Sequence, residues 1–352
     1  MEDPLERYRA MRDFDSTTEP AGQVGAADQR RFVVQEHHAT ALHWDLRLER
    51  NGVLASWAVP KGIPPDPRQN HLAVQTEDHP LEYLDFSGDI PEGGYGAGSM
   101  SVWDRGTYEL EKATDRELIF VLHGERERGR FALFHTNGKQ WMIHRMDPPQ
   151  DPGRELMPKG WRPMGATDGD APPDDEGWAF EIAWPGRRGL VAVEGGRATV
   201  TDRKGDEITS LYPEARALAA ASGTTMFIVD GLFVVVGDNG RPDPQALELR
   251  AQARNDSARR RVVARLPATF MAVDLVWLEG HPLIDLPYDE RRRLLADLGV
   301  EGPQWQTPAH HVADGAALLE AAHAQGLAGV VAKRMSSLYR PGEESPDWIA
   351  IT

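Results

Sequence analysis

The chain has 352 residues and no cysteine, and its 55 acidic residues outnumber its 39 basic ones, which gives a formal net charge of −16. This length is enough for two domains, and the lack of cysteine excludes disulfides and thiolate metal sites, so any metal must be held by histidine and carboxylate. No apolar run reaches the length of a membrane span and the charged start MEDPLERYRA is unlike a signal peptide, so we expect a cytoplasmic protein without a membrane partner.

The first half of the chain has the pattern of a small β domain. Residues 1–30 are polar without regular periodicity, and we expect them to form an N-terminal arm. From residue 31 to 146, eight short runs rich in β-branched and aromatic residues are separated by turn signals such as Asn51-Gly52 and Asn137-Gly138. The runs are RFVVQ, HWDLRLER, LASWAVP, HLAVQTED, SMSVWDRGTYEL, LIFVLHG, RFALFHT and QWMIHRM. Eight such runs predict a closed antiparallel β-barrel.

The stretch QEHHATALHWDLR, residues 35–47, concentrates polar groups in a way that packing does not explain. From His43 onward polar and apolar residues alternate, so a strand would place His43, Asp45 and Arg47 on one face. His37 can join them if the chain turns after it. Two imidazoles and one carboxylate form a three-ligand site for a divalent transition metal with open coordination positions, and Arg47 would hold a phosphate oxygen beside it. The pattern therefore indicates metal-assisted phosphoester hydrolysis.

Two other interpretations of this stretch remain open. His43 and Asp45 also fit hydrogen-bonded surface residues of a barrel strand. Two histidines and one carboxylate also match the metal site of a non-haem iron oxygenase.

Beyond the barrel the composition changes. Residues 147–177 are rich in Pro, Gly and Asp and lose their hydrophobic periodicity, which predicts a linker. From residue 178 to 352, strand-like runs alternate with helical segments around residues 214–222, 290–298 and 315–324. This mixture predicts an α+β domain.

Ordered motifs in the first half resemble the 3′-phosphoesterase domain of bacterial DNA ligase D, the multifunctional ligase of non-homologous end joining. Between about residues 8 and 146 they are VVQEHHATALHWDLRLE, SWAVPKG, LAVQTEDHPLEY, IPEGGYGAG and VWDRGTYE. The resemblance implies a β-barrel enzyme that uses Mn²⁺ at DNA 3′ ends, removing a terminal ribonucleoside and then the 3′-phosphate to leave a hydroxyl. Because neither half of the chain is basic, DNA would be held by a local arginine patch, and binding would weaken as salt rises.

The same resemblance assigns roles to individual residues. The metal ligands fall on His37, His43 and Asp45, in agreement with the strand pattern. The phosphate-contacting and catalytic positions are Arg47, His79 and Tyr83, and the functional positions of the arm are Arg12, Asp13 and Glu19. One position departs from the family: His71 stands where the family has a phosphate-binding arginine ahead of LAVQ, which would weaken phosphate binding or make it pH-dependent.

From about residue 162 the chain resembles the adenylyltransferase domain of ATP-dependent DNA ligases, through WAFEIAWPGRR, VDGLFVV, AGVVAKR and SLYRPGEESPDWIAIT. Ala183 stands where the family has the lysine that forms the AMP adduct, and Pro185 replaces the aspartate that follows. Alanine cannot attack ATP, so we expect no adduct. Other polar family positions are also replaced, at Leu232, Ala328, Ala350 and Thr352, whereas Arg188, Lys333 and Arg340 are retained.

We therefore predict a multidomain protein with an all-β barrel phosphoesterase followed by an α+β nucleotidyltransferase-like domain of the ligase adenylation fold that cannot seal DNA. The sequence stops before the oligonucleotide-binding barrel of ligases, which agrees with this expectation. The expected partners are DNA 3′ ends, including ribonucleotide-terminated primer-templates, and end-joining proteins or an active ligase. The alternative is a non-catalytic adaptor that binds DNA ends or repair proteins, and the second half could also serve only as a structural partner of the barrel.

Overall fold

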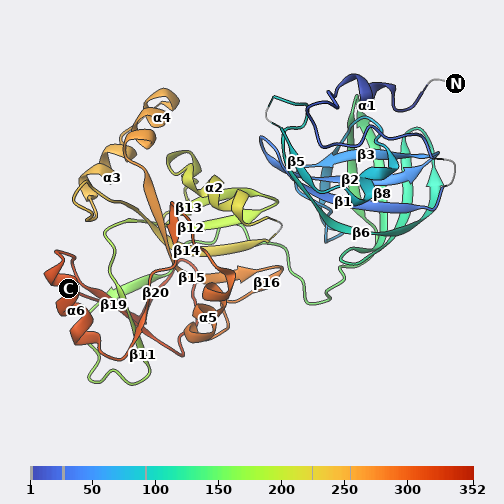
Figure 1. The fold of residues 1–352 in the computed structure, drawn as a ribbon. Helices are drawn as coiled ribbons and strands as arrows, with labels where there is room; N and C mark the ends of the chain where they lie inside the picture. Colours follow the sequence, from blue (N-terminus) through green and yellow to red (C-terminus); the bar gives the residue numbers. More distant parts are fainter. Residues whose placement is uncertain (1–2, 26–27, 92, 224, 254) are drawn as a thin grey trace. The chain divides into compact units, whose positions relative to one another are not determined.

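The computed structural model of the chain describes residues 3–25, 28–91, 93–223, 225–253 and 255–352. The chain divides into two compact units, Met1–Arg154 and Glu155–Thr352, shown as ribbons in Figure 1. Among the described residues, no helix has the length and apolar character needed to cross a bilayer.

The first unit is built on a closed antiparallel barrel. Its elements are α1 (Glu6–Ala10), β1 (Arg31–His38), β2 (Leu42–Arg50), β3 (Val53–Val59), β4 (Asn70–Gln75), the 3₁₀ helix η1 (Leu81–Asp85), β5 (Gly88–Ile90), β6 (Gly98–Ala113), β7 (Glu117–Gly124), β8 (Arg128–Asn137) and β9 (Gln140–Arg145). The described strands run in the order β1-β2-β3-β4-β9-β8-β7-β6, β6 pairs back with β1, and β5 pairs with β6 outside the ring. The eight predicted runs are the eight strands of this ring, and the barrel prediction is confirmed.

The wall formed by β1 and β2 is buried on both faces. Trp44, Leu46 and Leu48 of β2 belong to the apolar core inside the barrel. Because side chains alternate along a strand, the residues between them point to the outer face. That face is covered by a second apolar cluster, to which the arm contributes the fully buried Leu5 and Tyr8.

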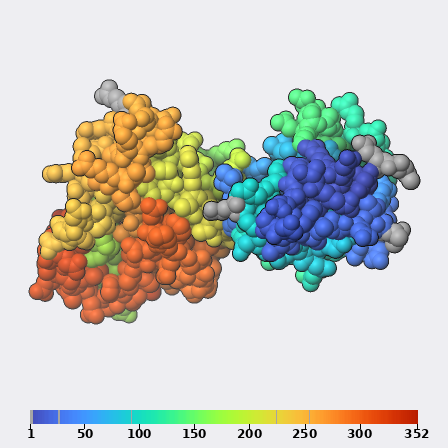
Figure 2. Space-filling model, turned by 45° about the horizontal axis from the view of Figure 1, so that its top comes forward, coloured from blue at the N-terminus to red at the C-terminus, as the bar shows by residue number. Residues whose placement is uncertain are grey.

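The arm therefore packs on the barrel. The space-filling view shows it in dark blue, spread over the first unit (Figure 2). Short as it is, α1 is anchored by the Tyr8 hydroxyl, which donates a hydrogen bond of 2.5 Å to the carbonyl oxygen of Pro20. Two outer-face side chains, Gln35 of β1 and Arg47 of β2, contact Tyr83 of η1.

The second unit consists of two sheets with helices on their outer faces. Its elements are β10 (Gly165–Asp168), β11 (Trp178–Ile182), β12 (Arg187–Glu194), β13 (Arg197–Asp202), η2 (Thr209–Leu211), α2 (Glu214–Ala221), β14 (Phe227–Val235), α3 (Pro244–Ala251), α4 (Asp256–Arg265), β15 (Ala268–Leu278), β16 (His281–Pro282), α5 (Tyr288–Leu298), β17 (Trp305–Gln306), β18 (His311–Val312), α6 (Gly315–Ala324), β19 (Val330–Arg334) and β20 (Glu344–Ile351). The described strands form a sheet β13-β12-β14-β15-β16, in which β17 also pairs with β15, and a sheet β10-β20-β19-β11-β18. The α+β prediction is confirmed.

The two sheets of this unit meet in an apolar layer that includes Ile228, Trp277 and Trp348. Helices α2, α3 and α5 contact the first sheet, and α6 contacts β11 and β19 of the second. Part of the segment expected as a linker, β10, pairs in parallel with β20. Strand pairing therefore orders four residues whose sequence has no strand periodicity.

Candidate active site

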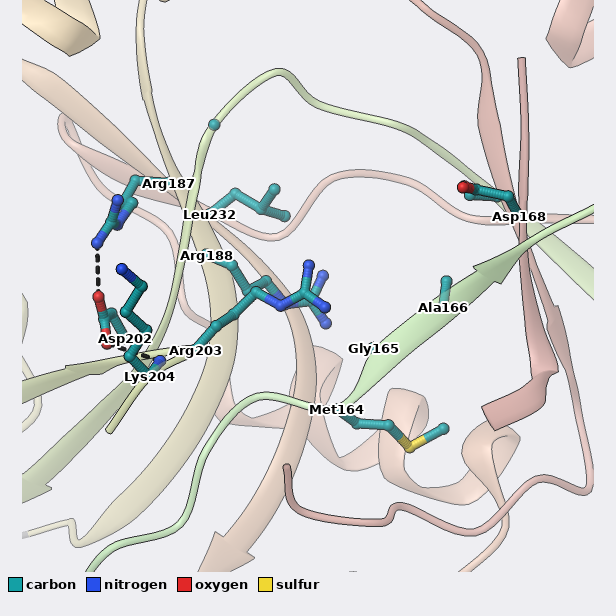
Figure 3. Close-up of a pocket in the computed structure, with 12 residues that line it drawn as sticks. Met164, Gly165, Ala166, Asp168, Arg187, Arg188, Asp202, Arg203, Lys204 and Leu232 are labelled. Atoms are coloured by element: carbon teal, nitrogen blue, oxygen red, sulfur yellow. Dashed lines mark hydrogen bonds and ion pairs between the residues drawn. The ribbon is translucent and has the colours of Figure 1, made fainter. Parts of the chain in front are cut away.

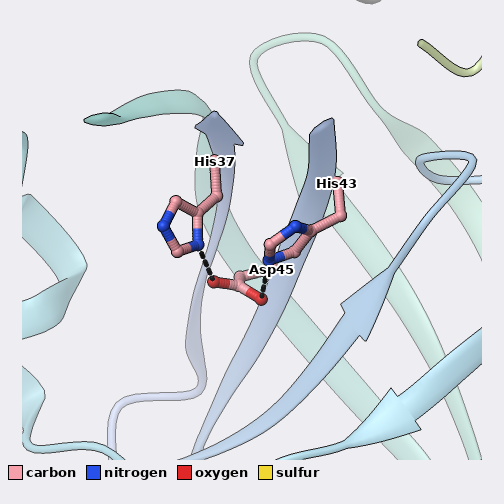
Figure 4. Close-up of side chains that lie close together, drawn as sticks. All are labelled: His37, His43 and Asp45. Atoms are coloured by element: carbon pink, nitrogen blue, oxygen red, sulfur yellow. Dashed lines mark ion pairs between the residues drawn. The ribbon is translucent and has the colours of Figure 1, made fainter. Parts of the chain in front are cut away.

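Three potential metal ligands converge on the hairpin of β1 and β2. In this hairpin His37 lies directly opposite His43, and Asp45 follows two residues later on β2. His37 Nδ1 is 3.6 Å from Asp45 Oδ2, and His43 Nε2 is 3.7 Å from Asp45 Oδ1 (Figure 4). One ligand atom from each residue lies within 4.8 Å of the others. Because metal–ligand distances to nitrogen and oxygen are about 2.0–2.2 Å, this spacing suits one divalent ion between them.

The hydrogen bonds of the two imidazoles define which nitrogens are free. His37 Nε2 lies 2.8 Å from the carbonyl oxygen of Gly96, and His43 Nδ1 lies 3.0 Å from that of Ala41. A carbonyl only accepts, so these nitrogens carry the protons, and His37 Nδ1 and His43 Nε2 offer lone pairs toward Asp45. His37 Nδ1 is buried and has no hydrogen-bond partner among the described residues. Metal-binding histidines have this arrangement, in which a backbone carbonyl fixes the tautomer, so the residues fit a divalent cation.

Asp45 is held as an anion by its neighbours. Burial favours its neutral form, but the positive charge of Arg47 opposes this effect, and the pKa of Asp45 is held well below its usual range. Arg47 Nη2 donates to Asp45 Oδ2 at 2.9 Å, and Arg47 Nε donates to Gln35 Oε1 at 2.7 Å. The third guanidinium nitrogen, Nη1, is buried and has no partner among the described residues. Arg47 therefore has one charged donor available for an anion.

The arm contributes a second arginine. Arg12 Nε donates to Glu19 Oε1 at 2.7 Å, Nη1 donates to Glu77 Oε1 at 3.2 Å, and Nη2 lies 3.2 Å from His79 Nε2. His79 Nδ1 donates to the carbonyl oxygen of Glu77 at 2.8 Å, so its Nε2 accepts from Arg12. Burial, together with Arg47 and Arg12, lowers the pKa of His79 well below its usual value. A neutral His79 therefore orients Arg12 and carries no charge of its own.

Tyr83 connects η1 to the same network. Its hydroxyl donates to Glu19 Oε1, the oxygen that also accepts from Arg12. Its ring lies 4.9 Å from the guanidinium carbon of Arg47. Burial raises the pKa of Tyr83 above its usual range, so the residue stays a neutral hydrogen-bond donor.

Most of the predicted site residues surround one cavity of about 290 Å³. Its lining includes Arg12, His37, His43, Asp45, Arg47, Glu77, His79, Tyr83 and Tyr95. Glu19 does not line this cavity but accepts hydrogen bonds from Arg12 and Tyr83, which do.

Two predicted residues lie elsewhere. The exposed Asp13 accepts a hydrogen bond of 3.2 Å from the backbone N–H of Asp15. His71 shares the inner face of β4 with the core residue Ala73, and its Nδ1 lies 2.7 Å from the carbonyl oxygen of Gly62. Neither side chain lines the cavity around the three potential ligands.

Two residues of the network were missed by sequence reasoning. Gln35 holds Arg47 and donates through Nε2 to the carbonyl oxygens of Tyr83 and Phe86, at 3.0 and 2.8 Å. Its position two residues before His37 on β1 is the signal that could have revealed it, because alternate residues share a face. Glu77 is buried with one carboxylate oxygen unpartnered among the described residues, and no spacing in the sequence indicated this.

The second unit has a larger cavity, of about 610 Å³ (Figure 3). Its lining includes the basic residues Arg187, Arg188, Arg203 and Lys204, the acidic residues Asp168 and Asp202, and Leu232 and Ala350. The last two are positions at which the sequence predicts that polar groups of the ligase family are replaced.

Two cations of this unit are neutralised by carboxylates. Arg188 makes a two-bond pair with Asp230, at 2.7 and 2.8 Å. Lys333 is buried, 2.9 Å from Glu181. Both cations are thus engaged within the protein.

The chain resembles known proteins along nearly its whole length. The family model of the DNA ligase D 3′-phosphoesterase domain matches residues 35–135, and that of the ATP-dependent DNA ligase domain matches residues 173–351. The multifunctional non-homologous end joining protein LigD of Mycolicibacterium smegmatis is 39% identical over 361 residues, covering 99% of this chain and 45% of that protein. LigD of Pseudomonas aeruginosa is 35% identical over 407 residues, covering 99% and 47%. The chain thus spans less than half the length of these relatives.

Among solved structures, the second unit is similar to a mycobacterial DNA ligase D complexed with ATP and MES. The sequence identity is 30%, the TM-score is 0.47, and the match covers 55% of this chain and 60% of that one.

Proposed function

Because the chain belongs to the ATP-dependent DNA ligase domain family and carries a DNA ligase D-type 3′-phosphoesterase domain before the ligase-type domain, we propose that it processes DNA 3′ ends for end joining. The substrates are primer-templates that end in a ribonucleotide or a 3′-phosphate. Hydrolysis removes the terminal ribonucleoside and then the phosphate, leaving a 3′-hydroxyl. The metal is Mn²⁺, and the partners are DNA ends and end-joining proteins or an active ligase.

The observation that carries this proposal is the pairing of a three-ligand cluster with an unpartnered arginine nitrogen. His37, His43 and Asp45 present their free atoms to one another, and Arg47 Nη1 is buried in the wall of the same cavity. A buried cationic donor is costly unless an anion reaches it. A phosphate group satisfies the metal and the arginine together, which favours phosphoester chemistry over the oxygenase alternative.

The residues have distinct roles in this proposal. His37 Nδ1, His43 Nε2 and an Asp45 oxygen would hold Mn²⁺, which when bound supplies Lewis-acid polarisation of the phosphoester and lowers the pKa of a coordinated water. Arg47 donates from Nη1 to a phosphate oxygen and stabilises the charge that develops there.

The arm supplies a second arginine to the cavity. Arg12 is held in place by Glu19, Glu77 and His79. Tyr83 keeps Glu19 and the face of Arg47 in position.

The second unit is proposed to be inactive as a ligase. Ala183 has no nucleophilic atom, and Lys333 is buried and paired with Glu181. Its pKa is lowered by burial, but it lies against Glu181 and is covered by the Trp348 ring 4.2 Å away, so it does not replace the missing nucleophile.

The test uses purified protein, Mn²⁺ and two 5′-labelled primer-templates, one ending in a single ribonucleotide and one ending in a 3′-phosphate. On a denaturing gel, we expect shortening of the first primer to a 3′-phosphate and then conversion of both to a 3′-hydroxyl. Accumulation at the 3′-phosphate would show that the phosphatase step is lost while ribonucleoside removal is retained. No change in either primer would contradict the proposal and favour the adaptor alternative.

A further inference from the structure

The loop between β5 and β6 brings an aromatic side chain to the candidate active site. Its Gly96 carbonyl orients His37, and the neighbouring Tyr95 lines the same cavity. Tyr95 is 47% exposed and is the only aromatic among the large, exposed apolar side chains of the described residues. The guanidinium carbon of Arg12 lies 5.7 Å from its ring centroid.

The backbone that follows Tyr95 lies close to the end of β1. Gly98 has φ +142°, and a Cβ there would lie 2.2 Å from the carbonyl oxygen of His38. Gly96 has φ +76°, and a Cβ there would lie 3.7 Å from the His37 ring. Gly96 and Gly98 thus lie against the end of β1, and Tyr95 lines the cavity beside them.

The cavity has more apolar wall than a metal ion and a phosphate need. Beside the polar groups, its lining includes Ala39, Ala58, Ile90 and Met100. At about 290 Å³, it has room for one terminal unit of a nucleic-acid strand. The unit that can enter is the one at the 3′ end.

We propose that Tyr95 is a specificity-determining residue that contacts the 3′-terminal nucleoside, which is the leaving group of the first step. The inference rests on the proposed function, because it concerns the substrate of the same cavity. In that step, water adds to phosphorus, the bond from phosphorus to the nucleoside O5′ breaks, and the nucleoside leaves with a proton on O5′. Stacking on a tyrosine ring is insensitive to the base, so Tyr95 accepts any terminal nucleoside.

A contact between Tyr95 and the terminal nucleoside would affect the two hydrolytic steps differently. The terminal nucleoside lies on the leaving side of the phosphorus only in the first step. In the second step, water adds to phosphorus and the bond to the primer O3′ breaks, and the ribonucleoside that contacts Tyr95 has already left. Tyr95 therefore contributes to ribonucleoside removal more than to 3′-phosphate removal.

The test compares Tyr95→Ala and Tyr95→Phe with the unsubstituted protein on both primers, with Met146→Ala, an exposed side chain elsewhere in the unit, as a control for handling. We expect Tyr95→Ala to lower kcat/KM for the ribonucleotide-ended primer, relative to that for the 3′-phosphate primer, by about 10-fold through KM, the usual size of a lost stacking contact. Tyr95→Phe keeps the ring and should keep the unsubstituted ratio. An equal loss on both primers, or no loss on either, would overturn the inference.

A binding measurement separates this inference from the proposed function. A primer that ends in a 2-aminopurine ribonucleoside loses fluorescence when its base stacks, and without added metal it is not cleaved. We expect quenching by the unsubstituted protein and by Tyr95→Phe, and little quenching by Tyr95→Ala. Equal quenching by Tyr95→Ala would overturn the role of Tyr95 even if both primers are processed. Failure of the unsubstituted protein to process either primer would count against the proposed function.

Discussion

His37 Nδ1 and Arg47 Nη1 are buried polar atoms without a hydrogen-bond partner among the described residues. Leaving such a group unsatisfied costs about 1–3 kcal/mol, and more when the group is charged. Both atoms belong to the wall of the same cavity, where a metal ion and a phosphate oxygen would satisfy them. The site is therefore recognised by two buried polar atoms without hydrogen-bond partners among the described residues, as well as by its histidines, aspartate and arginine.

Gln35 positions the Arg47 guanidinium. Replacing it with methionine keeps the volume but removes the acceptor for Arg47 Nε and the donor to two carbonyl oxygens. We expect Gln35→Met to lower the stability of the unit by about 1–3 kcal/mol and to lower kcat more than Mn²⁺ affinity. Gln35→Glu, which keeps the acceptor, should recover part of kcat. Chemical denaturation, Mn²⁺ titration and primer cleavage together check this, and an unchanged kcat for Gln35→Met would contradict it.

Glu127 lies outside the site and makes the stability of the first unit depend on pH. Burial raises its pKa from the usual value of 4.5 to about 7, against the effect of Arg145 at 3.4 Å. Because the folded state binds this proton more tightly than the unfolded state, its contribution to stability is fully present below pH 4.5 and is lost as pH rises toward 7.

The matched variant is Glu127→Gln. Relative to it, the unsubstituted protein should lose up to about 3 kcal/mol between pH 4.5 and 8. Urea denaturation of both proteins across this range measures the difference. Parallel stability profiles would show that Glu127 does not titrate with a raised pKa.

Among the structural elements, the N-terminal arm packs on the barrel and also supplies side chains to the candidate active site. Tyr8 contacts His79 and Tyr83 edge-on, with ring centroids 5.2 and 5.9 Å apart, and the guanidinium carbon of Arg12 lies 3.9 Å from the centre of its ring. The arm carries Arg12 and Glu19 but none of the three potential metal ligands. Its docking should therefore control catalysis without controlling metal binding.

Tyr8→Ala tests this separation. Loss of a buried ring costs about 3–5 kcal/mol, here mostly of arm docking, so we expect faster proteolysis within the first 25 residues and at least 10-fold lower primer cleavage. The Mn²⁺ affinity should stay within a few-fold of that of the unsubstituted protein. Tyr8→Phe, which loses only the hydrogen bond to Pro20, should be much milder. A parallel loss of Mn²⁺ binding in Tyr8→Ala would count against the account.

The β1–β2 hairpin shows which features of the candidate site could be predicted from the sequence. Alternation correctly placed Asp45 and Arg47 opposite the apolar residues of β2. The sequence suggested only that a turn brings His37 near, whereas the structure places it on the partner strand, directly across from His43. The three residues between the strands, Ala-Thr-Ala, include no glycine or asparagine, so the usual hairpin signal was absent.

At the scale of the whole molecule, the fold was more predictable than the site network. Barrel strands repeat a local pattern, so eight runs were enough to identify the ring. Contacts of the arm with η1 and with the segment before it join residues far apart in sequence, as in the pairs Glu19–Tyr83 and Arg12–Glu77. Local periodicity has no information about such pairs. The placement of His71 on the inner face likewise depends on strand register.

The second unit has the ligase-type fold, and Ala183 stands where we predict the adduct-forming lysine of the family. With labelled ATP and Mg²⁺ or Mn²⁺, we expect no protein-bound AMP from the unsubstituted chain. Ala183→Lys alone should also fail to form it, because Leu232, Ala328 and Ala350 remain apolar. A labelled band on a denaturing gel from the unsubstituted chain would contradict the inactive-ligase proposal.

The most direct test of the central claim compares His37→Ala with its neighbour His38→Ala in the primer-cleavage gel at saturating Mn²⁺. His37 offers a free buried nitrogen to the cluster, whereas His38 is more exposed and is paired with Glu36 at 2.7 Å. We predict that His37→Ala abolishes cleavage of both primers and that His38→Ala retains it. Cleavage retained by His37→Ala would contradict the account.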